Sequence, residues 1–273
     1  MPELPEVETV RIALCNELLN EKIKTVQIKN NKLRYPVSRD FELNLKDIEV
    51  RKILRRGKFL IFLLEKDISF ICHLGMTGTF RIQKKYDAEK HDHVIFFLSK
   101  NVIVYNDVRK FGFLKIENSS NVLNSKHIKN LGIEPLEAQF DFNFLKNQLK
   151  NKKYCIKTFL MNQKNIAGLG NIYCSEILFD CGISPKRLSY KLKKVEIERL
   201  IFSIKKIINS AIKKGGTTIQ NYLAPEGKLG YFQNSLRVYG RSEKSCLRCS
   251  NNVKIKKIFI QGRSTFFCKK CQK

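Results

Sequence analysis

The chain has 273 residues, of which 43% are hydrophobic and 10% aromatic, a composition that excludes a disordered protein and allows two domains with cores of their own. It carries 52 Lys and Arg against 25 Asp and Glu, and this net charge of +27 exceeds what solubility requires and indicates a polyanionic partner. It has no run of 18 apolar residues and no basic segment followed by an apolar core at its start, so we expect neither a transmembrane helix nor a secretory signal.

The first eight residues, Met-Pro-Glu-Leu-Pro-Glu-Val-Glu, have a chemical and a structural interpretation. Removal of Met1 would leave a secondary amine at Pro2 with a pKa near ~8, so part of it would be neutral and nucleophilic. Glu3 would then be placed to transfer a proton. In the structural interpretation Pro5 begins a helix, because proline and acidic residues suit the first helical turn.

Residues 22–117 contain short runs rich in β-branched and aromatic residues, separated by turn residues. This spacing predicts an all-β sandwich. The expected strands cover residues 23–28, 48–50, 58–64, 68–74, 79–82, 94–98, 102–105 and 111–116.

After an Asn- and Ser-rich connector at residues 119–140, the periodicity becomes helical. The last expected helix stops at Gly215 and Gly216, which is a typical C-terminal signal. Residues 217–240 show little periodicity, and a loop of that length in a compact protein is usually functional. The expected helices cover residues 142–149, 155–161, 173–180 and 195–212.

The C-terminal part carries a strong excess of charge and a metal-binding pattern. Residues 186–273 hold 22 basic and four acidic residues, which is +18 of the total +27. Two Cys-x-x-Cys pairs, Cys246/Cys249 and Cys268/Cys271, are separated by eighteen residues, a spacing that predicts one structural Zn²⁺ with four thiolate ligands. A hairpin turning at residues 261–263 fits between them. The other five cysteines are scattered singly, which suits a reducing cytosol and not a disulfide scaffold.

Three other motifs have both a functional and a structural interpretation. The Gly-rich residues 165–171 precede a helix whose free N–H groups can bind phosphate, or they form a plain corner between helices. Met76, Arg109 and Phe111 stand at strand ends, where they can wedge into a DNA duplex, although Met76 and Phe111 are also ordinary core residues. His91 and His93 lack a third metal ligand, so a contact from His91 to phosphate is the preferred interpretation.

Together these motifs resemble the formamidopyrimidine-DNA glycosylase family, almost from end to end. Leu4 distinguishes this pattern from the pyrimidine-directed sister enzymes, which typically have Gly there. Val108 and Lys110 replace a usual Pro and Arg. The matching motifs are Pro2-Glu3-Leu4-Pro5-Glu6, Gly57-Lys58-Phe59-Leu60, His73-Leu74-Gly75-Met76, Lys90-His91-Asp92-His93, Arg109-Lys110-Phe111-Gly112, Gly168-Leu169-Gly170-Asn171, Gly215-Gly216-Thr217-Thr218, Val238-Tyr239-Gly240-Arg241 and the four-cysteine ribbon with Gly262-Arg263.

The resemblance implies an α+β multidomain fold. Residues 1–118 are expected to form a catalytic β-sandwich with the first helix packed on it, and residues 119–140 a connector. Residues 141–240 are expected to form a helix–two-turns–helix DNA-binding domain with a lesion-covering loop in residues 217–240. Residues 241–273 are expected to form a zinc-finger hairpin.

The resemblance also implies an activity. The expected enzyme is a bifunctional DNA glycosylase and AP lyase of base excision repair, a cytoplasmic monomer that removes oxidised purines from duplex DNA without a small-molecule cofactor. Pro2 would form a Schiff base with the deoxyribose, and β,δ-elimination would cut the strand. The implied catalytic residues are Pro2, Glu3, Lys58 and Arg263, and the implied DNA-binding residues are His91, Arg109, Lys153, Asn171, Met76 and Phe111.

Three alternatives remain open at this point. A glycosylase of the same superfamily with a preference for oxidised pyrimidines would share nearly all of these motifs. A zinc-ribbon DNA-binding protein without catalysis would bind DNA but give no borohydride-trapped adduct. An RNA or ribosome partner would fit the charge alone and predicts no preference for damaged DNA.

Overall fold

The computed structural model describes residues 1–217, 231–249 and 253–273, and these form two compact units. The first unit comprises Met1–Asn130 with Lys214–Gln233, and the second comprises Leu131–Lys213 with Asn234–Lys273. The predicted lesion-covering loop falls largely on residues 218–230, outside the described residues. No helix in the described ranges is long and apolar enough to cross a membrane.

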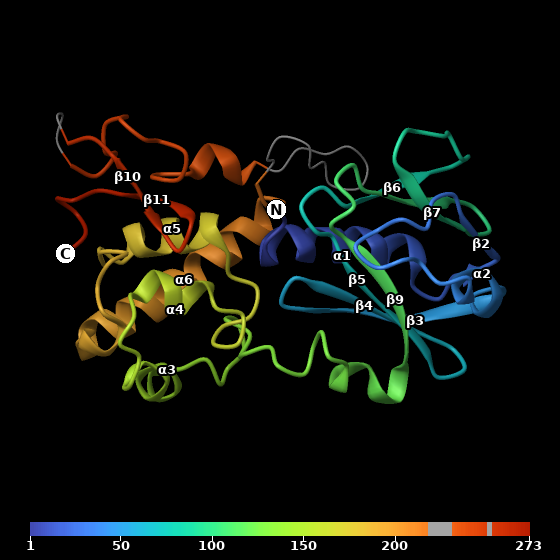
Figure 1. Ribbon diagram of the computed structural model, residues 1–273, viewed down its shortest axis with the longest axis horizontal. Helices are drawn as coiled ribbons and strands as arrows, with labels where there is room; N and C mark the ends of the chain where they lie inside the picture. Colours follow the sequence, from blue (N-terminus) through green and yellow to red (C-terminus); the bar gives the residue numbers. More distant parts are fainter. Residues whose placement is uncertain (218–230, 250–252) are drawn as a thin grey trace. The chain divides into compact units, whose positions relative to one another are not determined.

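The first unit is built on two antiparallel sheets (Figure 1). One sheet has the strand order β1-β3-β4-β5-β9 and the other β2-β7-β8-β6. Helix α1 (Leu4–Leu18) and the short helices α2 (Asp40–Asn44) and η1 (Ser119–Asn124) complete the unit. The strands are β1 (Lys22–Ile23), β2 (Thr25–Ile28), β3 (Ile48–Arg56), β4 (Phe59–Leu64), β5 (Ile68–His73), β6 (Thr79–Gln83), β7 (Asp92–Phe97), β8 (Val102–Asn106) and β9 (Phe113–Asn118).

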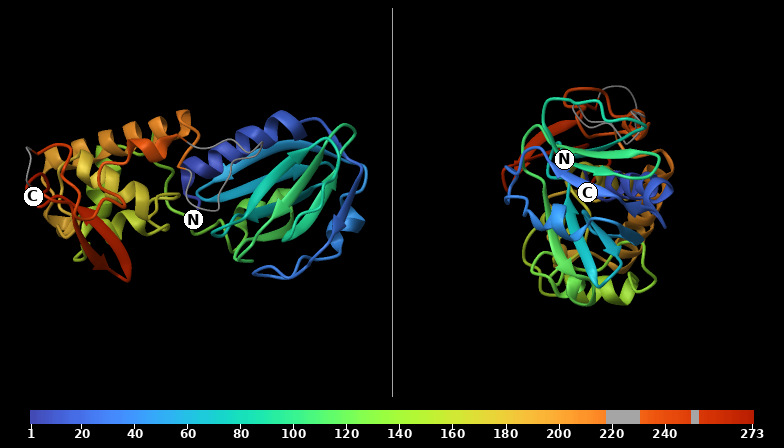
Figure 2. Two further views of the ribbon diagram at one scale, coloured as in Figure 1. Left: turned by 90° about the horizontal axis from the view of Figure 1, so that it is seen from above. Right: turned by 90° about the vertical axis from the view of Figure 1, so that its right-hand side faces the viewer.

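One continuous hydrophobic core joins the two sheets and α1. Phe62 and Phe70 on neighbouring strands stack with ring centroids 4.1 Å apart, and Phe70 stacks on Phe96 of the other sheet at 5.8 Å. From α1, Val7, Val10, Leu14 and Leu18 enter the same core, as the helical spacing of these residues predicts. Figure 2 shows α1 running alongside the strands of this unit. The predicted β-sandwich with a packed N-terminal helix is thus confirmed.

The second unit contains the predicted helices and a hairpin. Helix α5 is buried along almost its whole length, because helices α4 and α6 and strand β11 all contact it. Helix α6 buries a single face, and Gly215, with φ +71, lies two residues beyond its end. The elements are α3 (Phe142–Leu149), α4 (Ile156–Met161), α5 (Asn171–Asp180), η2 (Ser189–Lys191), α6 (Lys194–Lys213), β10 (Lys256–Ile260) and β11 (Arg263–Phe267). The short helix η4 (Phe232–Ser235) includes residues of both units.

Candidate active site

The N-terminal residues are buried at the start of α1. Glu3 and Glu6 are 2% and 1% exposed, and Pro2 is buried as well. Glu3 caps the helix through a capping box with Glu6, whose carboxylate accepts the Glu3 backbone N–H at 2.8 Å. Pro5 stands in the first turn, which confirms the structural interpretation of this stretch. The helix begins at Leu4 and leaves Pro2 outside it, where its nitrogen takes no part in helical hydrogen bonding.

The surroundings of the amino terminus favour a neutral amine. Burial lowers the pKa of the Met1 amino group below 8.0, and the charges of Lys58 and Arg109 also lower it, while Glu3 and Glu6 act in the opposite direction. A neutral amine is the nucleophilic form. Removal of Met1 would place the Pro2 nitrogen next to these same groups, so the two interpretations of the first eight residues are compatible.

Lys58 lies in the two-residue turn between β3 and β4. Arg56 and Phe59 pair at the ends of these strands, and Gly57 occupies the first turn position with φ +56. A positive φ at this position is typical of type II′ hairpin turns and favours glycine. Lys58 is only 7% exposed, and its charge is among the causes that lower the pKa of the Met1 amine. The fold therefore places a buried cation near the amino terminus.

Two loops of the first unit, residues 74–78 and 107–112, are fastened together by a buried carboxylate. Asp107 is fully buried and accepts hydrogen bonds from the Thr77 hydroxyl at 2.5 Å and the Gly112 backbone N–H at 2.8 Å. Its Oδ1 also accepts the Arg109 N–H at 3.2 Å. A Cβ added at Gly75 would lie 2.4 Å from the Gly112 nitrogen, so the two backbones are in direct contact. Motifs that are thirty residues apart in the chain thus form one surface.

This surface carries the three residues predicted to enter DNA. Phe111 is 46% exposed and Arg109 is exposed, with its guanidinium 4.7 Å from the centre of the Phe111 ring. Met76 is half-buried. Phe111 is therefore not an ordinary core residue, and the interpretation that it packs in the interior is wrong. An exposed aromatic ring with a cation on its face can insert between bases.

His91 and His93 have different roles in the structure. His91 is half-buried with φ +75, a conformation that non-glycine residues adopt rarely and mostly at functional sites. His93 is fully buried, and its ring nitrogens lie 3.1 Å from the Asn30 carbonyl oxygen and 3.0 Å from that of Asp107. Within residues 1–217, 231–249 and 253–273, the potential metal ligands gather in threes or more only at the four C-terminal cysteines. The histidine pair is therefore no metal site.

In the second unit, Asn171 is part of a network that the sequence did not indicate. Lys157 on α4 is fully buried, and its Nζ donates to the Asn171 Oδ1 at 2.6 Å, to the Thr265 hydroxyl at 2.5 Å and to the Ser264 carbonyl at 3.2 Å. The Asn171 amide nitrogen also donates to the Ser264 carbonyl at 2.9 Å. The start of α5 is thus tied to the strand that begins with Arg263. In the sequence, the only sign of this network was a lysine, Lys157, on the apolar face of a short helix.

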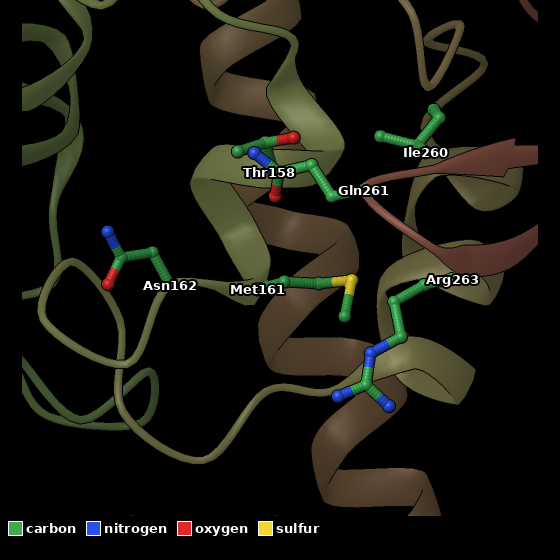
Figure 3. Close-up of a pocket in the computed structure, with 6 residues that line it drawn as sticks. All are labelled: Thr158, Met161, Asn162, Ile260, Gln261 and Arg263. Atoms are coloured by element: carbon green, nitrogen blue, oxygen red, sulfur yellow. The ribbon is translucent and has the colours of Figure 1, made fainter.

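Arg263 begins β11 and is exposed beside a cavity of about 330 Å³. The cavity lies between the end of α4 and the hairpin turn. Met161 and Arg263 extend into the space between these elements (Figure 3). Lys153 is exposed in the segment between α3 and α4. The remaining lining residues are Thr158, Asn162, Ile260 and Gln261.

The four C-terminal cysteines converge on one point. Their sulfur atoms all lie within 4.8 Å of one another, and the Cys249–Cys271, Cys249–Cys268 and Cys246–Cys271 separations are 3.0, 3.6 and 3.8 Å. Cys246 and Cys268 are buried, and the other two are half-buried. Four thiolates in this arrangement could hold a metal ion.

Two buried carboxylates position backbone segments far away in the sequence. Glu176 on α5 is 3% exposed and accepts the backbone N–H groups of Arg237, Val238 and Tyr239 at 2.8–2.9 Å. Burial raises the pKa of Glu176, and these three hydrogen bonds oppose that shift. In the first unit, Glu6 accepts the backbone N–H of Thr217. Sequence reasoning assigned no role to Glu176 and placed Glu6 only as a carboxylate close to Pro2 at the start of a helix. Neither long-range pairing could be foreseen, because it follows no local period.

Two family models match the chain. The formamidopyrimidine-DNA glycosylase N-terminal domain matches residues 1–114, and the formamidopyrimidine-DNA glycosylase H2TH domain matches residues 131–222. Curated relatives named formamidopyrimidine-DNA glycosylase include one from a Wolbachia pipientis strain of Culex pipiens, 43% identical over 100% of both chains. Another, from Rickettsia felis, is 41% identical over 100% of this chain and 98% of the relative.

Similar solved structures come from Lactococcus lactis. A point mutant of its Fpg in complex with Fapy-dG-containing DNA has a TM-score of 0.91 at 36% identity, with 100% of both chains covered. The wild-type protein in complex with DNA containing an oxidised pyrimidine has a TM-score of 0.90 at 35% identity, again over 100% of both chains. The similarity thus extends over the whole length of the chain.

Proposed function

The chain belongs to the formamidopyrimidine-DNA glycosylase family, and from this we propose that Pro2, once Met1 is removed, is its catalytic nucleophile. The protein is a DNA glycosylase with AP lyase activity that removes oxidised purines in base excision repair, and its partner is damaged duplex DNA. The observation that carries the proposal for Pro2 is its own burial beside the Met1 amino group. Partial burial lowers the pKa of that amino group, which lies near Glu3 and Lys58.

In the proposed mechanism the neutral nitrogen of Pro2 attacks C1′ of the damaged nucleotide. The C1′–N bond to the base breaks, the base leaves with a proton, and an iminium links Pro2 to the opened sugar. Glu3 assists the proton transfers. The iminium acidifies the C2′ proton, so the 3′ phosphate leaves by β-elimination and the 5′ phosphate by δ-elimination. Hydrolysis of the remaining iminium then releases the sugar remnant as an aldehyde and frees Pro2.

Lys58 and Arg263 are proposed to stabilise charge on the phosphate side of the reaction. Lys58 is buried near the amino terminus, where an ammonium has a large electrostatic effect and can also donate a proton. The pKa of arginine is above ~12, so Arg263 is proposed to act electrostatically and not as a proton donor.

The proposed DNA contacts combine exposed residues (Arg109, Phe111 and Lys153) with half-buried ones (Met76, His91 and Asn171). Arg109 and Phe111, with Met76, are proposed to fill the gap left by the flipped nucleotide and to wedge the opposite strand. The exposure of Arg109 and Phe111 and the support that Asp107 gives to their loop favour this role. His91, Lys153 and Asn171 are proposed to contact phosphates.

The cysteine cluster is proposed to bind one structural Zn²⁺. A tetrahedral site with Zn–S distances near ~2.3 Å requires sulfur separations of about 3.8 Å. The Cys249–Cys268 and Cys246–Cys271 separations of 3.6 and 3.8 Å fit that requirement, whereas the Cys249–Cys271 separation of 3.0 Å is shorter. Four thiolates leave no open coordination position for catalysis. Cys246, Cys249, Cys268 and Cys271 would hold the ion and thereby fix the ends of the β10–β11 hairpin. A monomeric state and a cytoplasmic location stay predictions.

Mass spectrometry of the borohydride-reduced adduct tests the proposal for Pro2. The mature protein, incubated with a duplex containing 8-oxoguanine, should carry the sugar remnant on the N-terminal proline. A protein that keeps Met1, or a Pro2→Gly variant, should show a strong loss of the adduct at unchanged DNA affinity. An adduct on a lysine side chain would overturn the assignment. A parallel duplex with thymine glycol would test the preference for purines.

A further inference from the structure

Arg55 on β3 connects helix α1 to the turn that carries Lys58. Its Nε donates to the Glu8 Oε2 at 2.9 Å, and its Nη1 donates to the Gly57 carbonyl at 3.1 Å. Glu8 is held in turn by Arg11, whose Nε and Nη2 lie 2.9 and 2.7 Å from Oε1. The side chains of Arg55 and Glu8 are only 12% and 16% exposed, so water screens this pair weakly.

We infer that Arg55, anchored by Glu8, is a positioning residue that sets the place of Lys58 relative to the N-terminal nucleophile. This inference rests on the proposed function, because it concerns the role of Lys58 in that reaction. Glu8 lies on the helix that begins just after Pro2 and Glu3, whereas Lys58 lies in a turn between two strands. The guanidinium of Arg55 spans these two elements.

The geometry explains why the carbonyl of Gly57 is an effective point of attachment. This carbonyl belongs to the peptide group that joins Gly57 to Lys58, so its orientation fixes the backbone at the start of Lys58. Glycine itself cannot hold the turn, because it adopts many backbone conformations at little cost. The hydrogen bond from Arg55 removes this freedom at Gly57, whose φ is +56.

An arginine is needed for this task on chemical grounds. Its planar guanidinium offers separate N–H groups in a rigid fork, so one group can face Glu8 while another faces Gly57. A lysine would present one flexible ammonium and hold the two partners far less rigidly. We therefore expect that a positive charge at position 55 is not sufficient to hold the Lys58 turn in place.

Single-turnover kinetics on a duplex containing 8-oxoguanine test the inference. Arg55→Met should lower the excision rate by about 10- to 100-fold, the usual effect of a catalytic group displaced by about 1 Å, while DNA affinity changes less than about twofold. Arg55→Lys should recover only part of this loss. A wild-type rate in Arg55→Lys would overturn the inference, because it would show that only the charge matters.

The matched control is Arg51→Met on the same strand. Arg51 pairs with Glu49 and Glu65 at 2.8 and 2.6 Å, and its side chain is 55% exposed. This variant loses the same positive charge from the same strand without touching the Lys58 turn. Its excision rate should stay within about twofold of the wild type, as expected for an exposed ion pair. A loss equal to that of Arg55→Met would overturn the inference.

A double-mutant cycle with Lys58→Met separates positioning from general stability. If Arg55 acts through Lys58, then Arg55→Met should slow a Lys58→Met protein by no more than about twofold. If the two losses multiply, the inference fails although the role of Lys58 stands. If Lys58→Met is as fast as the wild type, the proposed function of Lys58 fails, and the inference fails with it.

Glu8→Gln provides a second variant in case Arg55→Met does not fold. It keeps the shape of the side chain and an acceptor for Arg55 but removes the charge shared by two arginines. Its excision rate should fall less than that of Arg55→Met, and this loss should also disappear in the Lys58→Met background. A loss that persists there would count against the inference.

Discussion

Glu6 and Thr217 are 211 positions apart in the chain, yet the Glu6 Oε1 lies 2.8 Å from the Thr217 backbone nitrogen and 3.0 Å from its hydroxyl. The other carboxylate oxygen accepts the N–H of Glu3. One buried side chain therefore holds both Glu3, the residue next to Pro2, and Thr217 in the segment that follows α6. A Cβ at Gly216 would lie 2.9 Å from Glu6, so a side chain there would disturb this contact.

Glu6→Gln should destabilise the first unit by about 1–3 kcal/mol, because an amide would direct N–H groups at backbone donors that are buried. Urea unfolding measured at neutral pH gives this difference. The adduct yield on damaged DNA should also fall, since Glu3 loses a fixed hydrogen bond. Unchanged unfolding together with an unchanged adduct yield would contradict the positioning role of Glu6.

Asp107→Asn should loosen the surface that carries Met76, Arg109 and Phe111. The amide would face the N–H of Gly112 or the hydroxyl of Thr77, both of which now donate to the carboxylate. We expect a loss of stability of about 2–4 kcal/mol. Hydrogen exchange should speed up in residues 74–78 and 107–112. Full protection of both loops in the variant would show that Asp107 does not hold them.

Lys157→Met should uncouple the hairpin from the helices of the second unit. The substitution removes the donor shared by Asn171, Ser264 and Thr265 and leaves their buried acceptors without it. A destabilisation of about 3 kcal/mol is expected, with faster hydrogen exchange at residues 171–175 and 263–267. Lys193→Met is the control, because Lys193 is exposed on the same unit and its loss should have no such effect.

Removal of the metal should weaken DNA binding and leave the β-sandwich folded. Chelation, or Cys246→Ser, would release the ends of the β10–β11 hairpin that carries Arg263. Elemental analysis should find one zinc per chain before treatment. Titration with a labelled duplex should then show lower affinity, while exchange protection in β3–β5 stays as it was. Intact DNA binding by Cys246→Ser would contradict the structural role of the metal.

The stability of the first unit should depend on pH through His73. Burial lowers the pKa of His73 from 6.5 to about 4, assisted by the charges of Lys58, Arg34 and His127. The folded state thus favours the neutral ring. The contribution of His73 to the free energy of unfolding is therefore complete above pH 6.5 and is lost as the pH falls towards 4. The loss amounts to about 3 kcal/mol. The free energy of unfolding should fall between pH 7.5 and pH 4.5 in the wild type, and this fall should be smaller by about that amount in His73→Gln. An equal fall in both proteins would refute the prediction.

Local periodicity and spacing were sufficient for most of the architecture. The spacing of short runs rich in β-branched and aromatic residues predicted the sandwich strands. The two Cys-x-x-Cys pairs predicted the cluster whose sulfur atoms lie within 4.8 Å of one another. Strand boundaries were less predictable. Strand β9 begins at Phe113 and not at Phe111, because Asp107 holds residues 107–112 in a loop that exposes the Phe111 ring.

Long-range polar contacts could not be predicted from the sequence. Lys157 and Glu176 lie within helices whose buried residues are mostly apolar. Their most distant partners are about 60 to 110 residues further along the chain. Nothing in a local pattern identifies which backbone group a buried charge will meet. For the same reason the sequence assigned no role to Arg55, which lies between two expected strands and binds Glu8 forty-seven positions earlier.

The three consecutive amides of Arg237, Val238 and Tyr239 all point at one carboxylate, that of Glu176. Such a row of N–H groups is the kind of concavity in which proteins commonly capture free anions. Here the Glu176 carboxylate already accepts all three N–H groups, so they are not available to bind inorganic phosphate or a nucleotide. In a protein of charge +27, the Glu176 carboxylate thus occupies one potential anion-binding site.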